Sequence, residues 1–98
     1  MKIVFSEIAE DELADAIRFY ELEFPGLGLR FKKEVKKALI RIREYPLAWP
    51  IEKGEIRRYI MHKFPYKILF SIENELILII AIAHLHRKPN YWIDRKKN

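Results

Sequence analysis

The chain of 98 residues contains no cysteine and no apolar run long enough to cross a membrane. The absence of cysteine excludes a disulfide-stabilised scaffold, a thiolate zinc site and a cysteine nucleophile. The longest apolar run, from Leu76 to Ala83, falls far short of the roughly 20 residues that a membrane-spanning helix needs. The first residues turn acidic at once and do not resemble a signal peptide. We therefore expect a cytoplasmic protein that makes no contact with a membrane.

Sequence motifs of several enzyme classes are also absent. The chain has no GxxxxGK[ST] phosphate-binding loop, no HExxH zinc-protease helix and no GxSxG nucleophile turn. No internal repeat, Gly/Ser linker or low-complexity tract divides it. Half of its residues are hydrophobic and 13% are aromatic. This is enough for a chain of this size to bury a core without disulfides or bound metal. We expect one domain over residues 1–98.

Charge of the two signs is separated along the chain. Residues 1–23 carry two basic and seven acidic groups, residues 24–49 carry seven basic and two acidic groups, and residues 50–98 carry ten basic and five acidic groups. The acidic first block can complement the basic second block at the surface. The third block has no such partner within the chain and is the better candidate for binding a polyanion or an acidic protein.

Hydrophobic periodicity predicts two helices and then a sheet. Ser6 is placed as the N-cap of a first amphipathic helix that ends at Pro25-Gly26, and a second apolar stripe from Leu27 ends at Pro46. After an irregular segment, the period changes to two, with strands over 56–63, 66–72 and 76–83 that follow a first strand over 1–5. Glu73-Asn74 is the expected turn of the last hairpin.

This order of elements predicts an α+β fold: an N-terminal strand and an antiparallel helical hairpin packed on one face of a mostly antiparallel four-stranded sheet. The tail from Asn90 to Lys97 could add a short C-terminal helix with Asn90 as its cap.

Polar and aromatic side chains crowd the segment just past the apolar strand. It contains His84, His86, Arg87, Lys88, Tyr91 and Trp92. Chemistry on RNA needs a base, cations for the phosphorane and an acid for the leaving oxygen, and histidine, arginine, lysine and tyrosine can supply these. A zinc site at the two histidines is disfavoured without cysteine ligands, and no metal or other cofactor is expected. The alternative is an open sheet face that is simply basic, which protects edge strands from aggregation.

Arg57 and Arg58 lie on the preceding strand. Because strand residues alternate between faces, only one of the two can lie on the exposed side, and the other is expected to be paired.

The sequence resembles the RelE/ParE superfamily of small toxins from type II toxin–antitoxin modules, and its ParE-like branch in particular. The matching stretches occur in the right order over nearly the whole chain: Tyr20 before Pro25-Gly26-Leu27-Gly28, Arg30-Phe31, Ile56-Arg57-Arg58, Phe64-Pro65-Tyr66-Lys67-Ile68, and Ala83 to Trp92 with Arg95. The resemblance implies a strand, a helical hairpin and three or more further antiparallel strands. It also implies a growth-inhibiting toxin that a cognate antitoxin neutralises with an acidic segment, for which the basic second and third blocks are suited.

The superfamily divides by mechanism. RelE-like members cleave mRNA on the ribosome without a metal, whereas ParE-like members are associated with inhibition of DNA gyrase. In a nuclease, the resemblance would make Lys67, His86, Arg87 and Tyr91 catalytic. Contact with the target or with nucleic acid would involve Arg57, Arg58, His84, Lys88, Trp92 and Arg95.

The catalytic pattern of the nucleases is only partly present. Lys67 stands where RelE-like enzymes carry an arginine, and a lysine cannot make the two parallel hydrogen bonds of a guanidinium. A gapless register places His86 and Trp92 at the positions of the second catalytic arginine and the tyrosine, and a shift of one position gives Arg87 and Tyr91. We expect a gyrase inhibitor, with an mRNA endoribonuclease as the alternative and a non-toxic binding domain as a third reading. Trp92 is also expected to close the core.

Overall fold

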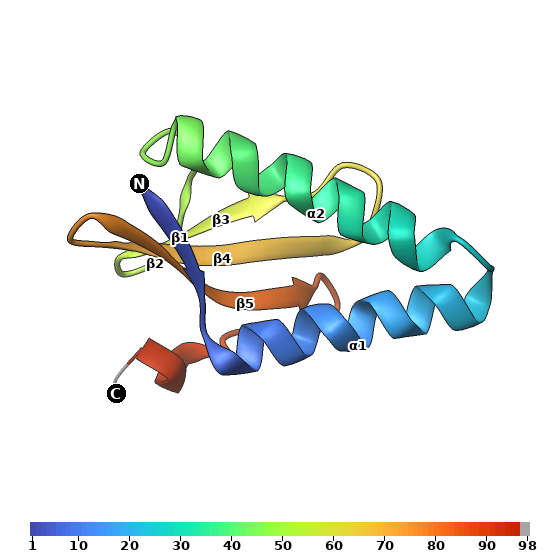
Figure 1. Ribbon diagram of the computed structural model, residues 1–98. Coiled ribbons are helices and arrows are strands. Elements are labelled where there is room, and N and C mark those ends of the chain that lie inside the picture. Colours follow the sequence, from blue (N-terminus) through green and yellow to red (C-terminus); the bar gives the residue numbers. More distant parts are fainter. Residues whose placement is uncertain (97–98) are drawn as a thin grey trace.

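The computed structural model describes residues 1–96 and has the α+β architecture of two helices on one face of a sheet (Figure 1). The helices are α1 (Glu7–Glu23) and α2 (Leu27–Glu44). The strands are β1 (Lys2–Phe5), β2 (Ile51–Lys53), β3 (Ile56–Ile60), β4 (Tyr66–Glu73) and β5 (Leu76–His84). None of the helices within these residues is long and apolar enough to span a membrane.

The sheet corrects the prediction of four strands. It has five strands in the order β1-β5-β4-β3-β2, and it is mixed because β1 runs parallel to β5 while the other pairs are antiparallel. The strand that the sequence did not reveal, β2, has three residues at one edge of the sheet. A three-residue strand is too short to show an alternating pattern. The strand predicted over 56–63 also ends earlier, at Ile60.

The helical hairpin follows the predicted signals closely. The Ser6 hydroxyl accepts a hydrogen bond from the backbone N–H of Ala9 at 3.1 Å, which satisfies one of the free donors at the start of α1. Gly26 links the two helices with a φ of 90°, in the left-handed region that glycine adopts without steric strain. The predicted antiparallel hairpin is therefore confirmed.

Two apolar clusters lie on opposite faces of the sheet, and both contain residues of β5. Ile77, Ile79 and Ile82 pack toward the helices, whereas Ile80 and Ala83 belong to the cluster on the other face with Trp92. A bulge in β5 opposite Leu69 and Phe70 places two successive residues on that second face. The uninterrupted apolar run of this strand thus reflects burial on both faces.

The C-terminal segment crosses the end of the sheet and lies beside the first turns of α1 (Figure 1). Its regular part is a 3₁₀ helix over Ile93–Lys96. Asn90, the expected cap, takes a positive φ of 61°, and its carbonyl accepts a hydrogen bond from the N–H of Ile93 at 3.0 Å. The helix expected from Asn90 onward therefore starts later and is a single 3₁₀ turn. Lys97 lies outside the described residues.

Candidate functional site

The residues singled out in the sequence gather where β5 ends, because the chain turns back on itself there. His84 ends β5, and its Nδ1 accepts a hydrogen bond from the backbone N–H of His86 at 3.1 Å. The ring of Tyr66 lies 5.1 Å from that of His84, edge to face. The Arg87 guanidinium stacks over the ring of Tyr91 at 3.8 Å, a cation–π contact that holds both side chains. The turn therefore forms an ordered cluster.

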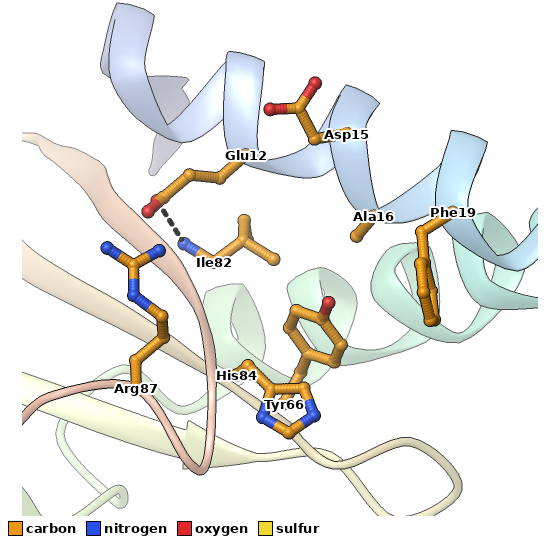
Figure 2. A pocket seen from close by; sticks show the side chains of 8 residues that line it. All are labelled: Glu12, Asp15, Ala16, Phe19, Tyr66, Ile82, His84 and Arg87. Carbon is orange, nitrogen blue, oxygen red and sulfur yellow. Dashed lines mark hydrogen bonds between the residues drawn. The ribbon is translucent and has the colours of Figure 1, made fainter.

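A pocket of about 380 Å³ lies between α1 and this end of the sheet (Figure 2). Its lining residues are Glu12, Asp15, Ala16, Phe19, Tyr66, Ile82, His84 and Arg87. Figure 2 shows the guanidinium of Arg87 on the same side as the carboxylate of Glu12, with Phe19 on the opposite side and Tyr66 and His84 below and between them. Phe19 is 54% exposed at the mouth. The pocket combines an apolar wall with groups of both charges, which suits a peptide or protein side chain.

Glu12 on α1 is the polar centre of the cluster. Its carboxylate accepts a hydrogen bond from the backbone N–H of Ile82 at 3.1 Å and another from the Tyr91 hydroxyl at 2.7 Å. The guanidinium of Arg95 donates to both carboxylate oxygens, at 2.8 and 3.0 Å. The Glu12 and Arg95 side chains are only 14% and 15% exposed. One carboxylate therefore fixes α1, β5 and the C-terminal segment together.

The hydroxyl of Tyr91 is unsuited to giving up its proton. Burial is the main cause that raises the pKa of Tyr91 above its ordinary value, and the hydrogen bond to the Glu12 carboxylate raises that pKa further. The nearby Arg95 and Arg87 act in the opposite direction without reversing the shift. A catalytic acid needs a pKa near the working pH, so this environment does not support the acid role expected of Tyr91 in a nuclease.

Lys67, the other expected catalytic cation, is committed to an ion pair. Its Nζ lies 2.5 Å from a carboxylate oxygen of Glu52 on β2, and both side chains are largely enclosed. The Arg58 guanidinium lies 3.6 Å from the other oxygen of Glu52 and donates to the carbonyl of Ile51 at 2.9 Å. Glu52 therefore neutralises two basic side chains of the face expected to contact the target.

Arg57 and Arg58 occupy different faces, as the alternation of the strand predicted. The Arg57 guanidinium donates to the carbonyls of Trp49 and Leu47, at 2.7 and 3.4 Å. Arg57 thus ties the segment before β2 to β3 through backbone acceptors instead of a carboxylate.

Trp92 is 3% exposed and packs in the apolar cluster on the face away from the helices. It closes the core there, as expected. His86 and Lys88 remain exposed on the turn.

The space left between the candidate catalytic residues is very small. A pocket of about 20 Å³ touches Lys67, His84, Arg87, Lys88, Tyr91 and Trp92. This volume is about that of one water molecule. Most of the predicted residues are therefore brought together as packed neighbours, with no room for a nucleotide between them.

Within the described part of the chain, no group of three or more carboxylates and histidines could hold a metal ion. The ring of His62, the third histidine of the chain, lies 6.2 Å from that of Tyr59.

Sequence reasoning missed Glu12 and Glu52, the two carboxylates that organise the basic residues. A signal for Glu12 exists, because it lies three residues after Ala9 and four before Ala16, the two buried residues of α1. At helical spacing this places it at the edge of the apolar stripe, where a charged side chain needs a partner. No comparable signal marks Glu52, which lies on the unpredicted strand.

Comparison with known proteins gives a family and a fold. The model of the family described as the ParE toxin of type II toxin–antitoxin system, parDE, matches residues 3–89. Among solved structures, a chain of the chromosomal ParDE TA system from P. aeruginosa is similar, with a TM-score of 0.70 and 15% identity over 86% of this chain and 95% of that chain. No curated protein sequence matches.

Proposed function

Because the chain belongs to the ParE toxin family of type II toxin–antitoxin systems, we propose that it stops growth by inhibiting DNA gyrase and that a cognate antitoxin neutralises it. The family match, which extends over residues 3–89, carries this proposal. The resemblance noted in the sequence implies the same target. The toxin then acts as a binding protein and needs no catalytic centre of its own.

The state of the candidate catalytic residues supports binding over RNA cleavage. Lys67 is paired with Glu52, so that this cation is not free to stabilise a phosphorane. The Tyr91 hydroxyl donates a hydrogen bond to the Glu12 carboxylate, and the pKa of Tyr91 is raised. In this proposal the turn after β5 is a contact surface, and His86, Arg87 and Lys88 are its exposed members.

Ribosome-dependent mRNA cleavage is the second candidate. The observation in its favour is the gathering of Lys67, His84, Arg87 and Tyr91 around one small pocket. This reading requires that binding of the ribosome or of mRNA separates Lys67 from Glu52.

Induction of the chain from a tightly repressed promoter in bacteria, with parallel pulse labelling of DNA and protein synthesis, tests the proposal. We expect DNA synthesis to fall first, with an SOS response and no new mRNA 3′ ends. A prompt fall in translation with new mRNA 3′ ends would establish the endoribonuclease instead. Unaffected growth would indicate a binding domain without toxicity. Co-expression with the antitoxin encoded beside the toxin should restore growth.

A further inference from the structure

The basic residues of α2 are not neutralised by the acidic residues of α1. The charge pattern suggested that these two blocks complement each other, yet no ion pair within residues 1–96 joins the two helices. Asp15 pairs with Arg18 of its own helix, Glu12 holds Arg95, and Glu21 accepts hydrogen bonds from the backbone N–H groups of Gly26 and Gly28. The positive charge of α2 therefore remains available to a partner.

Several cations of the third block, which the sequence favoured for polyanion binding, already contact other groups of the protein. Lys67 and Arg58 face Glu52, Arg95 faces Glu12, and Arg57 is bound to backbone carbonyls. Lys63 of this block lies beside α2, where its Nζ is 3.8 Å from a carboxylate oxygen of Glu34. The candidate surface for binding a polyanion is therefore on the second helix instead of the sheet.

One side of α2 carries a row of cations. Arg30, Lys33, Lys37 and Arg41 recur at intervals of three or four residues, which at helical spacing makes one stripe about 16 Å long. Lys63, from the loop after β3, joins this stripe at a pocket of about 210 Å³ lined by Arg30, Lys33, Glu34, Lys37 and two apolar residues. We call Arg30, Lys33, Lys37, Arg41 and Lys63 the α2 basic row.

Three contacts involve members of the row. Glu34 lies 3.2 Å from the Nζ of Lys37 and 3.8 Å from the Nζ of Lys63. The Arg41 guanidinium donates to the hydroxyl of buried Tyr59 at 2.7 Å, a bond that leaves its charge in place. In the described part of the chain, no hydrogen bond or ion pair involves the side chains of Arg30 and Lys33. Five cations thus face one carboxylate.

The composition of this surface favours phosphate over protein as its ligand. Protein–protein interfaces are depleted in lysine and enriched in aromatic residues at their centre, whereas interfaces with DNA are strongly basic and polar. The two apolar residues of the pocket, Leu27 and Phe64, are partly buried, and Phe64 packs against Tyr20 and Phe31. No aromatic ring is therefore offered for stacking on the bases of a single strand.

We propose that the α2 basic row binds the phosphate backbone of duplex DNA without sequence specificity. This goes beyond gyrase inhibition, because contact with DNA can be measured with no gyrase present. Weak binding to the DNA backbone would keep the toxin close to DNA, where its proposed target enzyme is bound. The toxin would then find that enzyme by diffusing along DNA.

The test is fluorescence anisotropy of a labelled 20-base-pair duplex with the purified full chain at several salt concentrations. Five phosphate contacts predict a plot of log K against log salt with a slope of roughly −4.5. K33A/K37A should weaken binding at least about tenfold at 0.1 M salt and reduce the slope by roughly 2, because two contacts are lost. The matched control is K32A/K36A, which removes two lysines at the same spacing from the same helix but outside the row.

The proposal is supported if K33A/K37A binds more weakly while K32A/K36A stays within about twofold of the native chain. It is overturned if both variants weaken equally, because net charge would then explain the binding. It is also overturned if the native chain does not bind the duplex at 50 mM salt, or if poly-L-glutamate binds the row more tightly than DNA does. Urea unfolding of both variants verifies that each is folded.

Discussion

At the residue scale, Glu12 has the greatest effect on the site, because a single carboxylate on α1 meets a backbone N–H, a tyrosine hydroxyl and an arginine. The three groups come from β5 and the C-terminal segment. The Arg95 side chain is mostly enclosed, and its guanidinium also donates a hydrogen bond to the carbonyl of Ile80 at 3.1 Å. The geometry of the candidate surface therefore depends on the charge of Glu12.

We expect Glu12→Gln to lower the free energy of unfolding by about 2 kcal/mol, because it leaves the enclosed Arg95 guanidinium without its counter-ion. Urea denaturation followed by circular dichroism measures the change. The matched control is Asp15→Asn, which breaks an exposed ion pair of the same helix with Arg18 and should change stability by less than about 0.5 kcal/mol. Equal effects of the two variants would refute the role given to Glu12.

Tyr91 gives a prediction about pH. Its folded-state pKa is raised mainly by burial, so folding favours the neutral hydroxyl. This contribution is complete below the unfolded value of 10.0 and is lost as the pH rises toward the higher folded value. In a spectrophotometric titration, the rise in tyrosinate absorbance between pH 9 and about 11 should be the same in Tyr91→Phe as in the native chain. Loss of signal in Tyr91→Phe would contradict the buried hydrogen bond.

At the element scale, the close approach of α1 and α2 depends on Gly28. A methyl carbon at this position would lie 2.6 Å from the carbonyl oxygen of Ile17, a backbone atom that cannot move without shifting α1. We expect Gly28→Ala to destabilise the fold by about 1–3 kcal/mol through this overlap. Leu29→Ala, next to it and 55% exposed, should cost less than about 1 kcal/mol. Thermal unfolding compares the stabilities of the two variants. If Gly28→Ala is as stable as the native chain, the close contact between Gly28 and the backbone of Ile17 is wrong.

The same scale explains which elements the sequence could predict. Both helices and the three longer strands after them were recognisable, because their apolar residues repeat at 3.6 or 2 residues and Ser6 caps α1. The strand β2 was not, since three residues cannot display a period. The parallel pairing of β1 with β5 was also missed, because it depends on how the hairpin returns the chain to the sheet and not on any local pattern.

The candidate site was predictable in position but not in chemistry. The polar segment after β5 was visible because it follows an uninterrupted apolar strand. Its partners were not visible, because Glu12 lies 83 positions before Arg95 and Glu52 lies 15 before Lys67. The sequence alone does not show which carboxylate pairs with a given basic residue in the fold.

At the scale of the whole molecule, the fold distributes its charge into two surfaces. The end of β5 and the C-terminal segment form a mostly neutralised cluster beside the pocket of Figure 2. The α2 basic row lies on the other helix and keeps most of its positive charge. The first surface is proposed to contact gyrase and the second to contact DNA, so that variants in one should leave binding through the other intact.

The measurement that tests the central claim most directly is a supercoiling assay with purified DNA gyrase, relaxed plasmid and increasing amounts of the purified chain. The account predicts dose-dependent loss of supercoiling, with no cleavage of mRNA on ribosomes under matched conditions. It also predicts that addition of the antitoxin restores supercoiling. Unchanged supercoiling at all doses, together with cleavage of ribosome-bound mRNA, would contradict the account and establish the endoribonuclease.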